Sequence, residues 1–288
     1  MDQTSPATAG VARKPRDDEI DVHGLTHLGL VRSENQDHFL ICSLKKHLEV
    51  HRTSLPMDEL HSADTERLAF IAMVADGVGG GEGGEEASRF ALRSVTEYVL
   101  GSTHCYYTAD ASNDAEFAQE LEDHALRVHD ELLRQSAGKL RATTLTLWLG
   151  VWPRAYLLQV GDSRYYMFRD NRLTQVSRDQ TLAQDLIDAG VLRPSTERFS
   201  RLANTLSSAI GGPTSRPEVV AVGNDWDTVH LLCSDGLTKH VSDERIAWHL
   251  AHMTSSKQAC EALLEEALTG GGTDNVTIIV GRAVRRGD

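Results

Sequence analysis

Short runs of apolar residues, separated by polar turns, predict most of the strands of this chain. Two short strands are predicted within residues 24–44, on either side of the polar stretch RSENQD, and LAFIAMVA at residues 68–75 predicts a buried strand. The runs TTLTLWLGVW, AYLLQV, YYMF and LTQV predict further strands, joined by short turns as in antiparallel hairpins. The last two predicted strands are TVHLLC at residues 228–233 and VTIIVGRAV at residues 276–284.

Apolar residues at helical spacing predict a second group of elements. One pair of helices is predicted at residues 85–100 and 114–136, and a shorter helix at residues 181–189. Two more begin near Ser242 and Ser256, because a serine hydroxyl is a suitable N-cap. Strands are grouped with strands and helices with helices, so the pattern favours an α+β fold with antiparallel sheets in one domain over residues 21–284.

The remaining segments lack a regular pattern. Residues 1–20 are polar and predict a disordered N-terminal tail, and residues 285–288 predict a short C-terminal tail. Residues 193–217 are rich in Ser, Gly and Pro and predict an irregular segment. Residues 45–66 predict a solvated excursion with three histidines whose spacing fits no zinc pattern, His47, His51 and His61.

Composition and charge narrow the classes of function. The 288 residues are 40% hydrophobic, enough for a large core, and the net charge of −13 is opposite in sign to that of most nucleic-acid-binding or membrane-surface proteins. The longest apolar run has eight residues, too few to span a membrane, and the N-terminus lacks the apolar core of a signal peptide. We therefore expect a cytoplasmic protein that binds neither nucleic acid nor membrane. Its four cysteines, at positions 42, 105, 233 and 260, form no CxxC pair. Cys42, Cys233 and Cys260 lie in apolar patterns, which predicts reduced thiols in the core.

Aspartates lie at the ends of several predicted strands. Each one by itself is explained by turn chemistry, because Asp-Gly and Asp-Asn are common turn dipeptides. Antiparallel neighbours bring strand ends together, however, and clustered carboxylates repel one another unless they share protons or a cation. An all-oxygen site suits Mg²⁺ or Mn²⁺ far better than Zn²⁺. The aspartates concerned are Asp37, Asp76, Asp162, Asp235 and Asp274.

In the stretch VADGVGGGEGG at residues 74–84, nearly all the residues after Asp76 are glycines. Missing side chains would let the backbone pass close to a metal ion or a phosphate, and would let the Gly77 carbonyl turn inward. Three of the glycines match G-x-G-x-x-G by spacing, but acidic residues in the loop and at the start of the next helix would repel a pyrophosphate. No Gly-Lys-Ser/Thr follows, so the pattern excludes a Walker phosphate loop. No cysteine has an arginine six residues later, as a phosphocysteine-forming phosphatase would require.

Taken in order, six motifs resemble those of the metal-dependent serine/threonine protein phosphatases, the PPM or type 2C family, in its compact bacterial form. The motifs are GLVRSENQD (29–37), VADGVGG (74–80), ATTLT (142–146), VGDSRYY (160–166), LLCSDGLTKHVSD (231–243) and GGTDNVTIIV (271–280). The resemblance covers residues 21–284, nearly the whole chain. It implies a four-layer α-β-β-α sandwich of two antiparallel sheets flanked by helices, with metal ions at one edge. Residues 180–217 fall where the family carries a mobile flap.

The resemblance also implies a set of ligands for two Mn²⁺ or Mg²⁺ ions. By this likeness Asp76 bridges both ions, and the Gly77 carbonyl binds one of them. Asp235 and Asp274 complete the shell of the first ion, and Asp37 helps to hold the second, directly or through water.

Further positions match or depart from the family pattern. Asp162 matches a residue of the third metal site seen in bacterial members, and Arg32 matches the arginine that grips the substrate phosphate. Gln36 stands where many relatives have Glu, which weakens the second site. Val78 stands where the animal enzymes have a histidine proposed as a general acid, a residue that bacterial members also lack. Ala142 replaces the usual glycine before the paired threonines, and no departure removes a main metal ligand.

These residues imply hydrolysis of phosphoserine and phosphothreonine in proteins, in signalling that opposes a serine/threonine kinase. Two ions roughly 3.5–4 Å apart would share a water and lower its pKa toward neutrality, and the hydroxide would attack phosphorus in line without a phosphoenzyme. Two other functions stay open. The intact aspartates disfavour a phosphoprotein-binding pseudophosphatase, and the charge of −13 disfavours another two-metal phosphoesterase such as a nuclease.

Overall fold

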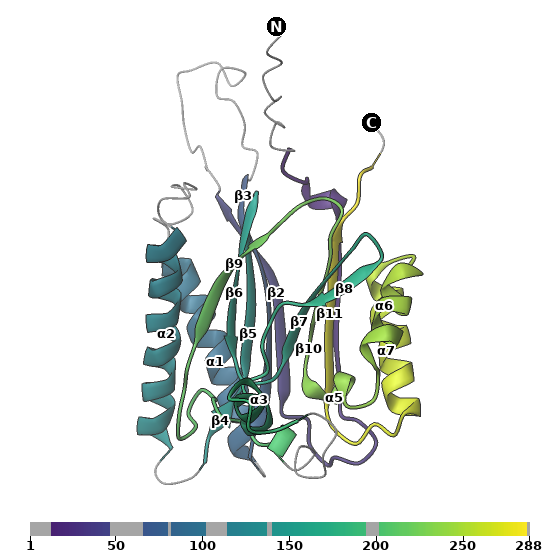
Figure 1. Ribbon diagram of the computed structural model, residues 1–288. Helices are drawn as coiled ribbons and strands as arrows, with labels where there is room; N and C mark the ends of the chain where they lie inside the picture. The colour runs from purple at the N-terminus through teal and green to yellow at the C-terminus, as the bar shows by residue number, and fades with distance from the viewer. Residues whose placement is uncertain are drawn as a thin grey trace, which may run out of the picture.

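The computed structural model describes residues 13–46, 66–79, 82–101, 114–136, 140–193 and 202–286. Two antiparallel sheets pack face to face, and helices cover both outer faces (Figure 1). The α+β class and the four-layer α-β-β-α sandwich predicted from the sequence are therefore confirmed. No helix in the described ranges has both the length and the apolar character needed to cross a membrane.

One sheet unites the two ends of the chain. In spatial order it contains β1 (Ile20–His27), β11 (Val276–Ala283), β10 (Val229–Cys233), β7 (Arg164–Arg169) and β8 (Arg172–Gln175). Its outer face is covered by α6 (Asp243–Ala251) and α7 (Ser256–Thr269). The hydroxyls of Ser242 and Ser255 accept hydrogen bonds from the backbone amides three residues later, so both helices start at the capping serines expected, the second one residue early.

The other sheet contains the middle of the chain. Its order is β2 (Asp37–Lys46), β3 (Glu66–Val78), β5 (Leu145–Val151), β6 (Arg154–Val160) and β9 (Glu218–Gly223), and the short β4 (Ala142–Thr143) pairs with β3. Its outer face is covered by α1 (Glu82–Gly101) and α2 (Asp114–Gln135). Short helices in the described residues that lie outside these layers include η1 (Asp17–Glu19), α3 (Leu182–Asp188) and α5 (Asp235–Thr238).

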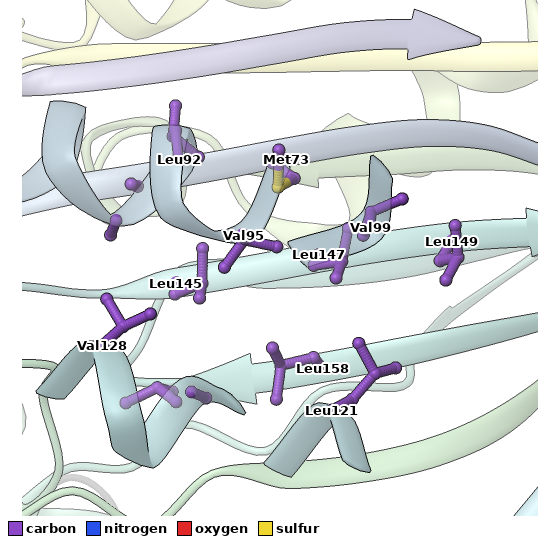
Figure 2. Close-up of a cluster of buried hydrophobic side chains, with 14 of the residues drawn as sticks. Met73, Leu92, Val95, Val99, Leu121, Val128, Leu145, Leu147, Leu149 and Leu158 are labelled. Carbon is purple, nitrogen blue, oxygen red and sulfur yellow. The ribbon is translucent and has the colours of Figure 1, made fainter. Parts of the chain in front are cut away.

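The two-residue period of the strands divides the core into layers. On β3, Met73 points toward α1 and α2, and Val74 points toward the opposite sheet. Figure 2 shows the helix-side layer, in which Met73, Leu145 and Leu147 lie against Val95 of α1. Burying these side chains stabilises the fold by roughly 1.5–3 kcal/mol for each large one. The same alternation continues to the strand ends and decides which polar residues face the space between the sheets.

The N-terminal boundary differs from the prediction. Residues 13–19 form η1 and a cluster of ion pairs, and β1 begins at Ile20. The fully buried carboxylate of Glu19 accepts hydrogen bonds from the Arg13 guanidinium at 2.6 and 2.7 Å and from the Arg16 amide at 2.8 Å. Disorder therefore does not hold for residues 13–20, because a polar sequence can still be ordered when its buried charge is paired. Residues 1–12 and 287–288 lie outside the described ranges.

The four central runs form antiparallel hairpins, as predicted, but the two hairpins lie in different sheets. β5 pairs with β6 and β7 pairs with β8, but β6 and β7 belong to different sheets. The chain crosses from one sheet to the other at residues 161–163. This crossing carries Asp162 to the end of the sandwich, where the space between the sheets opens.

Other predicted boundaries also change. β3 continues through Asp76 and Gly77 to Val78, and α1 begins at Glu82, so both elements extend into the stretch predicted as a glycine loop. β9 was not predicted at all, although it pairs with β6 along its whole length. Most of the predicted 45–66 excursion with its histidines lies outside the described residues, as do Cys105 and residues 194–201 of the expected flap.

His230 lies in the layer between the sheets. The residue is 9% exposed, its Nδ1 is 2.8 Å from the Tyr165 hydroxyl, and its ring centroid is 4.9 Å from that of Trp148. Burial lowers the pKa of His230 to about 4, although the Asp225 charge acts in the opposite direction. The imidazole is therefore neutral in the folded protein at neutral pH.

We expect this histidine to make the metal-free protein less stable in acid. Between pH 6.5 and about 4, the unfolded chain binds a proton that the folded protein does not, so the free energy of unfolding falls as the pH falls. The loss is about 2–3 kcal/mol across this window. His230→Asn keeps an acceptor for Tyr165 but cannot titrate. The free energy of unfolding of this variant, measured with urea in EDTA, should therefore fall less than that of the wild type between pH 7 and 4.5. The exposed His252→Asn is the control, and equal slopes in all three proteins would contradict the assignment.

Candidate active site

Strand alternation brings the predicted aspartates to one end of the sandwich. Asp37 and Asp76 face each other directly in the register of β2 and β3, on the same strand faces as the inter-sheet residues Phe39 and Val74. Asp235 follows β10 and begins α5, which Figure 1 places at the same end of the molecule as α3. Like charges directly opposite on neighbouring strands are destabilising, so this pairing needs a reason other than stability.

A cavity of about 570 Å³ opens between the sheets at this end. Six of the seven predicted site residues line it: Arg32, Asp76, Gly77, Asp162, Asp235 and Asp274. The seventh, Asp37, is not among the lining residues and lies behind Asp76. Additional lining residues include Gln36, Val78, Thr144, Asn204, Lys239 and Asn275.

Asp37 is the most deeply buried of the carboxylates. It is 3% exposed, and its Oδ2 accepts a hydrogen bond from the Thr277 hydroxyl at 2.8 Å. Its Oδ1 is buried and has no hydrogen-bond partner among the described residues. Burial raises the pKa of Asp37 to about 6, against the effect of its hydroxyl partners. An unsatisfied carboxylate oxygen at such a depth is costly unless another group binds it.

Three further carboxylates have raised pKa values. For Asp76, burial raises the pKa well above its usual value, and the charges of four other aspartates act in the same direction. Burial and then the Asp235 charge raise the pKa of Asp162 to about 8. Burial also raises the pKa of Asp235, even though Lys239 opposes it, and the Asp235 Oδ1 has no partner in the described part of the chain. The cavity is therefore short of positive charge.

Asp274 differs because two basic side chains hold it. Arg32 forms a fork with it, with Nε 2.8 Å from Oδ1 and Nη2 2.8 Å from Oδ2. Lys239 Nζ lies 2.7 Å from the same Oδ2 and 2.6 Å from Asp235 Oδ2. Burial would raise the pKa of Asp274, but hydrogen bonds from Arg32 and Lys239 outweigh it and lower the pKa.

Buried hydroxyl and amide groups form a hydrogen-bond network next to the aspartates. The Thr144 hydroxyl accepts a hydrogen bond from the Asp76 amide at 2.9 Å and lies 2.8 Å from the Ser163 hydroxyl. Gln159 donates to the Ser163 carbonyl at 2.7 Å and accepts from Thr146 at 2.9 Å. Because these groups are fully buried and bonded to one another, they hold the strand ends in one arrangement.

Asn275 fixes the loop that carries Arg32. Its Nδ2 donates to the carbonyls of Leu28 and Glu34 at 2.8 and 2.9 Å, and its Oδ1 accepts from the Gln36 amide at 2.9 Å. One side chain thus pins both ends of the loop between β1 and β2 beside Asp274.

Sequence reasoning did not single out Thr144, Lys239 or Asn275, although each lies within a quoted motif. The spacing of Lys239 could have identified it, because a lysine four residues after an aspartate in a helical turn lies on the same face. No local pattern points to Thr144 or Asn275, whose roles depend on contacts between distant segments.

The glycines near Asp76 serve packing between backbones. A Cβ at Gly77 would lie 2.4 Å from the Gly84 carbonyl oxygen and 2.9 Å from that of Gln36. The first turn of α1 can therefore approach β3 only because these side chains are missing. Gly77 lines the cavity, and its amide donates to the Gln36 carbonyl at 3.2 Å.

The donor set fits hard divalent cations. It is made of carboxylate and carbonyl oxygens. Among the described residues, Asp37 and Asp235 each have a buried oxygen without a partner, and the ammonium of Lys239 already bridges Asp235 and Asp274. Within the described ranges no three acidic, histidine or cysteine side chains form a ready-made metal-binding group in this conformation. Side chains around Asp274 would therefore have to adjust for an ion to bind.

Comparison with known proteins agrees with the fold. The family profile described as Protein phosphatase 2C matches residues 49–269. The chain belongs to the protein phosphatase 2C family. Among curated members, the serine/threonine protein phosphatase PstP of Mycobacterium tuberculosis is 33% identical over 216 residues, covering 75% of this chain and 41% of that protein. The phosphatase stp of Listeria welshimeri is 27% identical over 216 residues, covering 73% and 83%.

Solved structures of serine/threonine phosphatases have the same fold. The crystal structure of M. tuberculosis PstP/Ppp aligns with a TM-score of 0.70 at 26% identity, covering 92% of this chain and 99% of that one. A structure of the PstP catalytic domain in complex with two manganese ions aligns with a TM-score of 0.68 at 27% identity, with the same coverage. The chain thus spans less than half of the full-length curated PstP but nearly all of the chains in these structures.

Proposed function

We propose that this chain hydrolyses phosphoserine and phosphothreonine in proteins, using Mn²⁺ or Mg²⁺, as one catalytic domain over residues 21–284. The observation that carries the proposal is the cavity in which aspartates from separate segments meet, two of them with a buried oxygen left unpartnered. The names of the curated relatives, which are serine/threonine phosphatases, support the same reaction. A cytoplasmic location, which the free thiols of Cys233 and Cys260 support, and opposition to a serine/threonine kinase are further parts of the proposal.

In this proposal the aspartates hold the ions. Asp76 would contribute to both, and the Gly77 carbonyl would bind one of them. Asp235 and Asp274 would complete the first, and Asp37 would help to hold the second, directly or through water. Asp162 lies at the edge of the cavity, where a third ion would bind. When bound, Mn²⁺ or Mg²⁺ supplies positive charge to the phosphoryl group and lowers the pKa of water.

Arg32 orients the substrate. Its two bonds to Asp274 hold the guanidinium at the mouth of the cavity, where its side chain is 54% exposed, and leave three further N–H groups for phosphoryl oxygens. Val78 lines the cavity but has no proton donor, so the leaving seryl or threonyl oxygen takes its proton from water. Gln36 offers an amide where a carboxylate would bind the second ion more strongly.

Removing the Arg32 side chain should weaken substrate binding. We expect Arg32→Ala to raise the KM for a phosphothreonine peptide about tenfold or more, with a smaller fall in kcat, because a charge-assisted fork contributes roughly 1.5–3 kcal/mol. Arg245→Ala is the matched control, since Arg245 makes the same forked pair with Glu266 and is 49% exposed, but lies away from the cavity. Unchanged KM and kcat in Arg32→Ala would make Arg32 a structural residue.

One assay tests the proposed reaction. Purified protein is incubated with phosphoserine, phosphothreonine and phosphotyrosine peptides and with single-stranded DNA, with Mn²⁺, Mg²⁺ or EDTA. We expect phosphate release from the first two peptides with either ion and none in EDTA. Cleavage of DNA instead would support a nuclease, and Mn²⁺ binding by calorimetry without turnover of any substrate would support a phosphoprotein-binding pseudophosphatase.

A further inference from the structure

Lys239 occupies a cation position inside the acidic cavity. It follows the last residue of α5, and its amide donates to the Asp235 carbonyl at 2.9 Å, which turns its side chain back over the aspartates. The ammonium bridges two carboxylates from different segments, 2.6 Å from Asp235 Oδ2 and 2.7 Å from Asp274 Oδ2. Its side chain is only 29% exposed, so the charge is held in the cavity and does not extend into solvent.

The carboxylates around Lys239 differ in how many partners they have. Both oxygens of Asp274 are engaged, Oδ1 by Arg32 and by the Asn275 amide at 2.9 Å, and Oδ2 by Arg32 and Lys239. Asp235 keeps a buried Oδ1 that has no partner in the described residues. An incoming ion can therefore reach Asp235 directly, but it can bind Asp274 only if one of the existing partners leaves.

Lys239 is the partner that can leave with the smaller loss. Arg32 holds Asp274 through two parallel hydrogen bonds, and releasing it breaks both. Lys239 holds Asp274 through one and keeps its bond to Asp235 when that one breaks. Its long flexible stem also allows the ammonium to move without a change in the backbone.

We propose that Lys239 is a built-in counter-ion that bridges Asp235 and Asp274 in the metal-free protein and releases Asp274 when a divalent cation binds. This inference rests on the proposed function only in that the aspartates bind Mn²⁺. The lysine stabilises the metal-free site, where carboxylates outnumber basic side chains, and it lowers the affinity for the ion because the ion must displace it. Removing the charge of Lys239 should therefore strengthen metal binding and destabilise the metal-free protein.

Substitution of Lys239 tests both effects without an activity assay. Lys239→Met keeps an unbranched side chain, one atom shorter, and removes its charge. We expect the dissociation constant for Mn²⁺, measured by calorimetry, to fall about tenfold, and the melting temperature in EDTA to fall by several degrees. Lys257→Met is the matched control, because Lys257 also pairs with a carboxylate four residues later, Glu261 at 3.7 Å, but on the outer helix α7. It should leave both measurements unchanged.

The outcomes separate this inference from the proposed function. Mn²⁺ binding with an unchanged or weaker constant in Lys239→Met would overturn the role of Lys239 and leave the proposed function standing. Absence of Mn²⁺ binding in wild type and variants alike would remove both.

A measurement on the unaltered protein covers the case in which Lys239→Met does not fold. The amine of Lys239 is labelled with an acylating reagent in EDTA and in saturating Mn²⁺, and peptides are quantified by mass spectrometry. We expect labelling of Lys239 to rise several-fold with Mn²⁺ and labelling of Lys257 to stay constant. Equal or lower labelling of Lys239, with Mn²⁺ bound, would contradict displacement.

Discussion

Asp76→Asn should abolish metal-dependent phosphatase activity while leaving the protein folded. The substitution keeps the shape of the side chain but removes the charge that lies between Asp37 and the cavity. We expect kcat/KM for a phosphothreonine peptide with Mn²⁺ to fall about 10³-fold or more, since losing one group that acts on the transition state costs several kcal/mol. Calorimetry should show weaker Mn²⁺ binding in the same variant.

The stability of Asp76→Asn distinguishes this effect from misfolding. Burial, and after it the charges of four other aspartates, raise the pKa of Asp76, and Asp37 faces it directly in the sheet, so a neutral side chain avoids a buried charge and relieves repulsion in the metal-free protein. We expect a gain of about 1 kcal/mol, or roughly 2 °C in melting temperature in EDTA. Asp170→Asn, an exposed position in a turn, is the control for the chemical change. Wild-type activity in Asp76→Asn would end the metal-site assignment, and a loss of both activity and stability would leave misfolding as the explanation.

Gly236→Ala should be strongly destabilising. A Cβ at Gly236 would lie 1.9 Å from the backbone carbonyl oxygen of Asn275, a contact that only a backbone shift can relieve. That shift would separate Asp235 from Asp274, which α5 and β11 hold together. We expect a loss of about 3 kcal/mol or more, equivalent to roughly 6–10 °C in melting temperature, together with weaker Mn²⁺ binding.

Gly101→Ala is the matched control for this prediction. Gly101 ends α1, and a Cβ there would meet nothing within 4 Å, so the change should be neutral or slightly stabilising. The melting temperatures of both variants, measured by thermal unfolding in EDTA and in Mn²⁺, check these predictions. If Gly236→Ala has the same melting temperature as the wild type, the close approach of α5 to Asn275 is not present in solution.

The fold class and most of the strands could be predicted from the sequence because they depend on local patterns of apolar and polar residues. The two-residue alternation of β3 and β5 and the helical spacing of α1 and α2 depend only on neighbours along the chain. The ordered N-terminal residues were missed because the Glu19 carboxylate is paired with arginines within a segment that is polar throughout. β9 was missed because four of its six residues are exposed and its partner β6 lies far away in the sequence.

The candidate site shows the same division. Aspartates at strand ends could be identified one by one, but for each one taken alone turn chemistry was the favoured explanation. The crossing from β6 to β7 and the register of β2 with β3 bring them together, and neither is visible in a local window.

By itself, the sequence determined the element types, the two-sheet class and the identity of the acidic residues, because side-chain periodicity and motif chemistry are written along the chain. Only the tertiary structure decided that Asp37 lies behind Asp76, that glycines at 77 and 84 let two backbones touch, and that Lys239 bridges Asp235 and Asp274. Those facts depend on distances between segments far apart in the chain, which are set by packing and by the pairing of buried charge.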